Sequence, residues 1–188
     1  MLEIVASNLH WLGVTDEGVH DLCAHGGVRV SLDGELLVED VSDYAVSTGA
    51  LHLLRTLEAD HTSSRTGVGD EGEQLIPCCG HFMHVPPGSD RLWNLGCPEG
   101  VNWWVRHESE HVELDFPNGR RCTVTAQEWR RAVMAFSAQV WAFFAATPAK
   151  QPGDAWEAEW LPLFLKEWMT RGGHARPDTV GGAGPDSS

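Results

Sequence analysis

The chain has 188 residues, of which 42% are hydrophobic and nine are tryptophan, so it can bury a core of ordinary size. Its formal net charge of −14 argues against binding to nucleic acid or to an anionic membrane, since both need clustered Lys and Arg. No apolar run is long enough for a membrane span, and residues 1–5 lack the basic and apolar parts of a secretory leader. We expect one globular domain over residues 1–172, located in the cytoplasm.

Short apolar runs separated by turn residues predict strands in the first two thirds of the chain. Residues 28–32 and 35–38 flank Asp33-Gly34, a dipeptide typical of a two-residue hairpin turn. Over residues 47–60 apolar side chains recur at helical spacing after a serine that can cap a helix. The polar stretch 62–73 predicts an exposed loop.

Three antiparallel strands follow in the middle of the chain. Apolar and polar residues alternate over 101–106 and again over 112–116, with a turn predicted near 108–110. Pro117-Asn118-Gly119 is typical of a tight turn and returns the chain into a strand over 121–124.

The last third of the sequence predicts helices. Thr125 to Glu128 forms a capping box before a long apolar stripe, and Asp154 begins a second helix that Pro162 should interrupt or kink. Residues 173–188 are rich in Gly, Pro, Asp and Ser and predict a disordered tail. The fold class is therefore α+β, with an antiparallel sheet packed against the C-terminal helices.

Thiols and imidazoles come together in residues 77–84, Pro-Cys-Cys-Gly-His-Phe-Met-His, and in residues 96–100, Gly-Cys-Pro-Glu-Gly. Thiolate and imidazole suit zinc, and neighbouring glycines let the backbone approach an ion. In an extended segment Cys79 and His81 point to one side. We therefore expect a zinc held by Cys79, His81 and Cys97, with His84 or the upstream His25 as fourth ligand.

Other interpretations of this cluster remain open. Neither half is a Cys-x-x-Cys pair, and cysteine is often buried as a small apolar residue, so packed cysteines without metal are one alternative. Cys78 or Cys79 as a nucleophile with His81 as base is another. In the cytosol the five cysteines are expected as thiols or metal ligands rather than disulfides.

Residues 107–111 match the His-Glu-x-x-His string of zinc proteases, in which both imidazoles share one face of a helix. Here the string falls at a predicted turn between strands, so we interpret it as a solvated turn. The tryptophans outside the predicted helices offer a different kind of site. Trp11, Trp93, Trp103 and Trp104 lie in strand or turn contexts and are candidates for lining a ligand groove.

Three segments carry a resemblance to known proteins: Leu75 to Gly80, the stretch Gly-Cys-Pro-Glu-Gly-Val-Asn-Trp ending at Trp103, and the closing segment 160–172. Together they resemble a group of small bacterial proteins with Pro-Cys-Cys-Gly and Gly-Cys-Pro-x-Gly-x-x-Trp motifs. The resemblance spans most of the chain and implies no activity, ligand or catalytic residue.

These observations favour a small cytoplasmic, non-catalytic binding protein of the immunity or escort type, with a structural zinc as an optional part. Its acidity would suit a basic protein partner, and its aromatic residues would suit a small ligand. The alternative is a small metal- or thiol-dependent enzyme that uses Cys79, His81 and Cys97.

Overall fold

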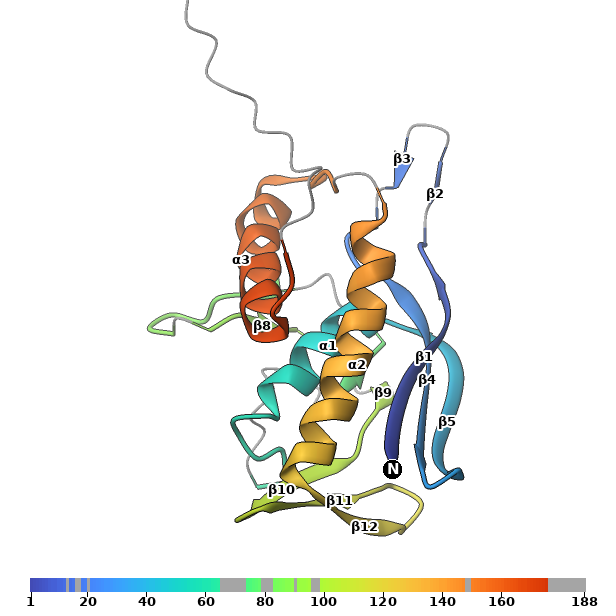
Figure 1. Cartoon of the computed structure of the whole chain (residues 1–188). Helices are drawn as coiled ribbons and strands as arrows, with labels where there is room; N and C mark the ends of the chain where they lie inside the picture. The colour runs from blue at the N-terminus through green and yellow to red at the C-terminus, as the bar shows by residue number, and fades with distance from the viewer. Residues whose placement is uncertain are drawn as a thin grey trace, which may run out of the picture.

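The computed structural model describes residues 1–12, 14–15, 18–19, 21–64, 74–78, 83–89, 91–95, 99–147 and 150–175. The described strands all lie in the first two thirds of the chain, and two of the three described helices lie in the last third (Figure 1). The strands are β1 (Leu2–His10), β2 (Val14–Thr15), β3 (Gly18–Val19), β4 (His25–Leu32), β5 (Glu35–Tyr44), β6 (Ile76–Pro77), β7 (Met83–His84), β8 (Trp93–Asn94), β9 (Gly100–Val101), β10 (Trp104–Glu108), β11 (His111–Asp115) and β12 (Arg121–Thr125). The helices are α1 (Val46–Arg55), α2 (Ala126–Ala145) and α3 (Ala155–Gly172). The fold class is α+β, which confirms the prediction.

The first sheet has the antiparallel order β1-β4-β5. Its β4–β5 hairpin turns at Asp33 and Gly34, whose φ angles of 52° and 83° are those that a two-residue turn needs. The hairpin predicted from Asp-Gly is therefore confirmed. At the opposite edge, the Gln139 side chain of α2 bonds both the N–H and the C=O of Ala6, at 2.9 and 2.8 Å. This amide pairs with β1 as a neighbouring strand would and protects the edge.

The second sheet has the antiparallel order β10-β11-β12. Ser109, with φ of 55°, lies in the first turn, and Gly119, with φ of 78°, in the second. Both turns lie where the sequence predicts them. Val105, Val112 and Leu114 are buried on one face, whereas alternate residues on the other face meet solvent.

Helix α2 begins with the predicted capping box. The Thr125 hydroxyl accepts from the Glu128 N–H at 3.1 Å, and the Glu128 carboxylate accepts from the Thr125 N–H at 3.3 Å. Its apolar face packs on β1 and α1, and its first turns reach β11 and β12. One helix thus contacts both three-stranded sheets (Figure 1).

Helix α3 begins at the predicted Asp154 cap and ends before Gly173, a left-handed residue with φ of 66°. It runs through Pro162 as one helix, so the predicted interruption is wrong. Trp160, Phe164 and Trp168 are buried on both sides of the proline, and their packing offsets the lost hydrogen bond. Trp156, on the first turn, is 36% exposed.

Helix α1 is buried along its whole length, and all ten of its residues are inaccessible to solvent. It contacts β4, β6, α2 and α3. The predicted serine cap is wrong: the helix starts at Val46, and the Ser47 hydroxyl accepts from the Ala24 N–H at 3.0 Å. At the C-terminal end of α1, the Arg55 side chain contacts Glu167 of α3. Helix α3 lies on the side of α1 that faces away from the first sheet (Figure 1).

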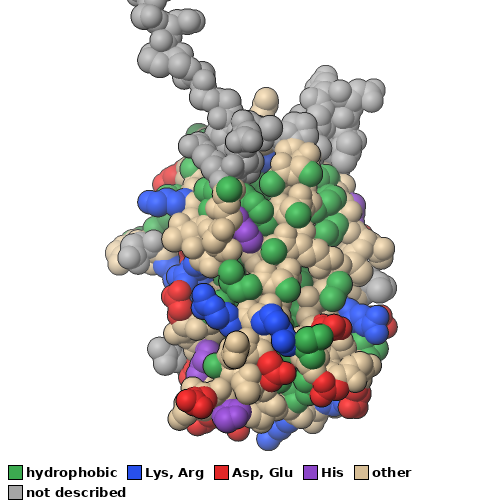
Figure 2. Space-filling view, viewed as in Figure 1, with side chains coloured by type: hydrophobic (Ala, Val, Ile, Leu, Met, Phe, Trp, Pro, Cys, Tyr) green, Lys and Arg blue, Asp and Glu red, His purple; other side chains and the backbone are tan. Residues whose placement is uncertain are grey.

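Charged side chains are unevenly spread over the surface. In the view of Figure 2, acidic side chains gather at the end that carries the second sheet, and Lys and Arg side chains gather near the C-terminal half of α3. Across the described residues, no helix is long and apolar enough to cross a membrane.

Full burial of α1 predicts a pH-dependent stability. Burial lowers the pKa of His52 well below its ordinary value of 6.5, and repulsion from Arg55 adds to the shift. The folded state therefore binds fewer protons than the unfolded state, so this contribution to stability is present above pH 6.5 and is lost below it. Urea unfolding at about pH 7.5 and about pH 5 should show a loss of stability in acid.

The matched variant is His52→Gln, which keeps a donor towards the Gln74 carbonyl that Nδ1 of His52 contacts at 3.1 Å. It should show a smaller difference between the two pH values than the wild type. An equal pH dependence in both proteins would contradict the assignment.

Candidate functional site

The predicted zinc ligands are only partly visible. Cys79, His81 and Cys97 lie outside the described residues. His84 is a partly buried residue of β7, where it pairs with Trp93 of β8. Within the described ranges, no group of three or more His, Cys, Asp or Glu side chains is arranged to hold a metal ion. The zinc site therefore stays a prediction.

Cys78 forms a disulfide bond, whereas Cys23 and Cys122 are thiols. This contradicts the expectation that all five cysteines are thiols or metal ligands. It also removes Cys78 as a nucleophile in the oxidised protein. The Cys78 N–H donates to the Glu99 carbonyl at 3.2 Å, next to the antiparallel β6–β9 pair, so the disulfide lies at the end of this short ladder.

The four tryptophans proposed for a groove lie in different surroundings. Trp103 is 1% exposed and stacks on Phe116, with ring centroids 6.0 Å apart, so it belongs to the core. Trp93 lies in β8. Trp11 packs on Phe143 of α2, at 5.2 Å between centroids. Trp104 lines a cavity on the outer face of the second sheet.

The surroundings of Trp11 include an unusual lysine. Lys150 Nζ lies 2.9 Å from the centroid of the Trp11 ring, in a cation–π contact. Burial lowers the pKa of Lys150 to about 8, although the nearby Asp21 carboxylate acts in the opposite direction. This contact holds Lys150, which follows α2, against Trp11, which follows β1.

The upstream alternative ligand, His25, is 3% exposed, and its Nε2 lies 3.2 Å from Asp21 Oδ2. Burial alone would raise the pKa of Asp21, but hydrogen bonds from His25 and from the N–H groups of Cys23 and Leu12 hold it below its ordinary value. Asp21 thus joins the chain on both sides of the β2–β3 pair.

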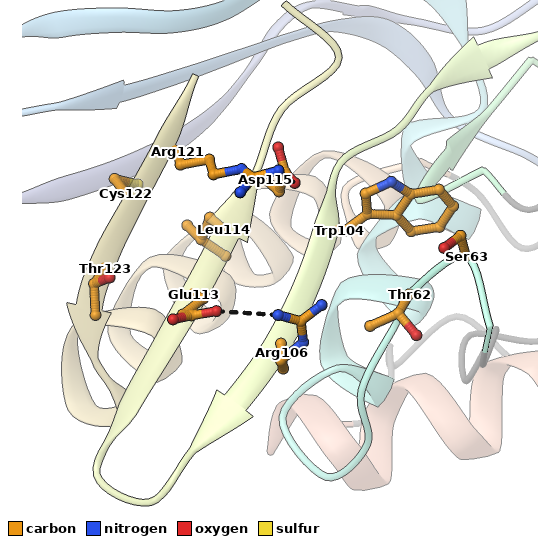
Figure 3. Close-up of a pocket in the computed structure, with 10 residues that line it drawn as sticks. All are labelled: Thr62, Ser63, Trp104, Arg106, Glu113, Leu114, Asp115, Arg121, Cys122 and Thr123. Atoms are coloured by element: carbon orange, nitrogen blue, oxygen red, sulfur yellow. Dashed lines mark hydrogen bonds and ion pairs between the residues drawn. The ribbon is translucent and has the colours of Figure 1, made fainter. Parts of the chain in front are cut away.

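The outer face of the second sheet forms a cavity of about 580 Å³ (Figure 3). The strand register builds it from two rows of side chains across the three strands. Trp104, Asp115 and Arg121 form one row, and Arg106, Glu113 and Thr123 form the other. Because successive side chains of a strand point to opposite faces of the sheet, these alternate residues share the solvent face. The remaining lining residues are Thr62, Ser63, Leu114 and Cys122.

One wall of the cavity is the segment after α1. His61 pairs with Val105 through two backbone hydrogen bonds of 2.9 and 2.7 Å, which hold the segment along β10. His61 is fully buried and lies 5.1 Å from Trp104 between ring centroids. Its Nε2 is 2.8 Å from the Asn102 side-chain oxygen. The buried His61 ring thus packs against Trp104, which lines the cavity.

Two ion pairs cross the strands on this face. Arg106 Nη1 lies 3.3 Å from Glu113 Oε2, and Arg121 Nη2 lies 3.0 Å from Asp115 Oδ2. All four side chains are more than one third exposed, so each pair contributes little to stability. Their arrangement instead gives the surface around Trp104 a fixed pattern of donors and acceptors.

The His-Glu-x-x-His string spans the hairpin between β10 and β11. His107 is in β10 and His111 in β11, on either side of the Ser109 turn, which confirms that the string is not helical. The His107 side chain is held by Asp60, whose Oδ1 is 3.0 Å from Nδ1 and 2.9 Å from the His107 N–H. The metalloprotease geometry is therefore absent from the string.

The Cys122 thiol also lines the cavity. Burial raises the pKa of the Cys122 thiol above its ordinary value, which reduces the nucleophilic thiolate at neutral pH. Cys122 pairs with Leu114 on the core side of the sheet. A tryptophan flanked by arginines, in contrast, is the kind of surface enriched at protein interfaces.

Most of this face was missed from the sequence. Trp104 was a candidate, but Arg106, Glu113, Asp115 and Arg121 were not. The strict alternation over β10 to β12 was the available signal, because it places these residues opposite one another once the two turns are fixed. Thr62 and Ser63 carried no such signal, since a tertiary contact brings them to the sheet.

Similarity offers no further guidance to the site. No protein family, curated protein or solved structure matches the chain. The candidate site is therefore inferred from the geometry of the described residues alone.

The disulfide of Cys78 predicts a defined thiol count. One intrachain disulfide uses two of the five cysteines, so unfolded, unreduced protein should show three reactive thiols and reduced protein five. Cys78→Ser should show four thiols with or without reductant, because the partner cysteine is released. Thiol titration in denaturant measures all of these values, and five thiols in unreduced wild type would contradict the disulfide.

Proposed function

We propose that the chain is a non-catalytic binding protein that engages a basic protein partner through the outer face of β10–β12. The observation that carries this proposal is the position of Trp104, fixed against His61 at the wall of an open cavity among cross-strand ion pairs. Large aromatic and arginine side chains supply most of the binding energy at protein interfaces.

Trp104 suits the role of an anchor because its environment is already ordered. The backbone of β10 at Trp104 and Val105 is paired on both sides, with β11 and with His61. Little side-chain entropy is then lost on binding, and more of the buried apolar area contributes to affinity. The charged rows around it form the polar rim that such interfaces commonly have.

The charge of this end of the molecule favours a basic partner. The two arginines of the cavity are matched by Glu113 and Asp115, while Glu108 and Glu110 add exposed carboxylates at the hairpin. The chain as a whole carries a charge of −14, which attracts a cationic protein over a long range.

The compartment is a separate part of the proposal. A cytoplasmic location was predicted from the sequence, whereas the Cys78 disulfide is typical of an oxidising compartment. A cytoplasmic protein would keep this bond only as a redox-responsive one. The alternative, an enzyme that uses Cys79, His81 and Cys97, depends on residues outside the described ones and stays a prediction.

Trp104→Ala should weaken binding by about thirtyfold, the loss expected for an aromatic interface anchor of ~2 kcal/mol. A basic partner is first recovered from an extract of the source organism with immobilised wild-type protein. The purified pair is then titrated by calorimetry against wild type and variant.

The matched control is Trp156→Ala, which removes an exposed tryptophan from α3. It should bind as wild type does, and all three proteins should keep the same thermal midpoint. The proposal fails if wild type retains no protein of positive net charge, or if Trp104→Ala binds as tightly as wild type.

A further inference from the structure

A second groove, of about 850 Å³, lies between the end of α1, the segment around β7 and β8, and the C-terminal half of α3. It is separate from the Trp104 cavity and shares no lining residue with it. Its volume is within the range of pockets that take small ligands. Its lining differs sharply in charge from the rest of the chain.

Five of the chain's 13 Lys and Arg residues line this groove. They face only two carboxylates among the described lining residues, so the lining carries a surplus of three positive charges in a chain of net charge −14. The cations are Arg55, Arg91, Arg130, Lys166 and Arg171, and the carboxylates are Glu58 and Glu167. Figure 2 shows basic side chains gathered near this end of α3.

Both carboxylates are bound by arginines. Arg55 Nε and Nη2 donate to the two oxygens of Glu167 at 2.9 and 2.6 Å. Arg171 bridges Glu167 at 2.8 Å and Glu58 at 2.7 Å. The charges of these four side chains cancel. Arg91, Arg130 and Lys166 complete the basic lining, and they come from the segment before β8, from α2 and from α3.

The pKa of Arg91 reflects both its burial and the cations around it. Burial lowers the pKa of Arg91 to about 10, and repulsion from Arg55 adds to the shift, while Glu167 opposes it. Several cations thus lie close enough to Arg91 to attract an anion to the same part of the groove. Arginine is also the side chain best suited to bidentate contact with carboxylate or phosphate.

The groove also offers exposed apolar surface. Val85 and Leu163 are 38% and 42% exposed, and both line it beside Leu57 and Leu92. They come from opposite walls, the segment after β7 and helix α3. A ligand that meets the cations and these two side chains together needs an anionic group and an apolar body.

We propose that this groove binds a small organic anion, whose carboxylate or phosphate lies among Arg91, Arg130 and Lys166 and whose apolar body lies between Val85 and Leu163. Arg55 and Arg171 act as positioning residues, since they neutralise the two carboxylates that would repel the ligand. The site does not depend on the partner surface at Trp104.

The test uses octyl phosphate and octanoate as probes, titrated by calorimetry into the full chain. At least one should bind, and the tighter of the two identifies the anionic group. Octyl glucoside, which has the same tail without charge, should bind at least tenfold more weakly. Equal binding of the glucoside would show that the groove binds the apolar tail without recognising the anionic group, and would overturn the proposal.

Arg91→Gln and Lys166→Gln should each weaken binding of the better probe by about tenfold, as expected for loss of one charge-assisted contact. Leu163→Asp should weaken it as well. Arg131→Gln, which removes an exposed arginine of α2 outside the groove, is the control and should bind as wild type does. The thermal midpoints of the variants confirm that they are folded.

Three results would overturn the proposal. Neither octyl probe binds the wild type, the groove variants bind as tightly as Arg131→Gln, or a peptide of about eight glutamates binds more tightly than both octyl probes. The last result would assign the groove to an acidic protein segment. None of these results bears on the Trp104 surface, so the two proposals succeed or fail separately.

Discussion

The complete burial of α1 is the constraint on which the rest of the structure depends. A helix enclosed on every side must satisfy its polar groups inside the protein, and each of its polar side chains has such a contact. It also has room for no side chain at Gly49, where a Cβ atom would lie 2.5 Å from Ile76 Cδ1. Its last residue, Arg55, is only 2% exposed and takes its counter-charge from Glu167 of α3. The ion pair thus fixes the last helix against the first.

This arrangement separates charge on the surface of an acidic protein. Near α3, the buried Arg55 binds Glu167 and Arg171 binds Glu58, and Lys and Arg outnumber the carboxylates among the described residues of the groove. At the second sheet, the cross-strand pairs balance locally and the exposed carboxylates of the hairpin are in excess. Two surfaces of different character result, one with an excess of Lys and Arg and the other with exposed carboxylates in excess.

Local signals predicted the local structure well. The Asp-Gly hairpin, the Thr125 capping box and the alternation of β10–β12 each depend on neighbours in sequence, and the structure has all three. Tertiary packing decided the rest. Pro162 stays inside α3 because buried aromatic residues flank it, and Arg55 meets Glu167 across 112 residues of sequence. No spacing rule could have brought the cations of the groove together, whereas the cysteine-rich segment drew attention by composition alone.

A double-mutant cycle on Arg55 and Glu167 tests the role of α1 most directly. Glu167→Gln should lower the free energy of unfolding by about 3–5 kcal/mol, because it leaves the buried charge of Arg55 uncompensated. Arg55→Met should lower it by less, because Arg171 still pairs with Glu167. The double variant should lose clearly less than the sum of the two. The same cycle on the exposed pair Arg106 and Glu113 should give a coupling of less than ~1 kcal/mol. Additive losses at Arg55 and Glu167, no larger than those of the exposed pair, would contradict the account.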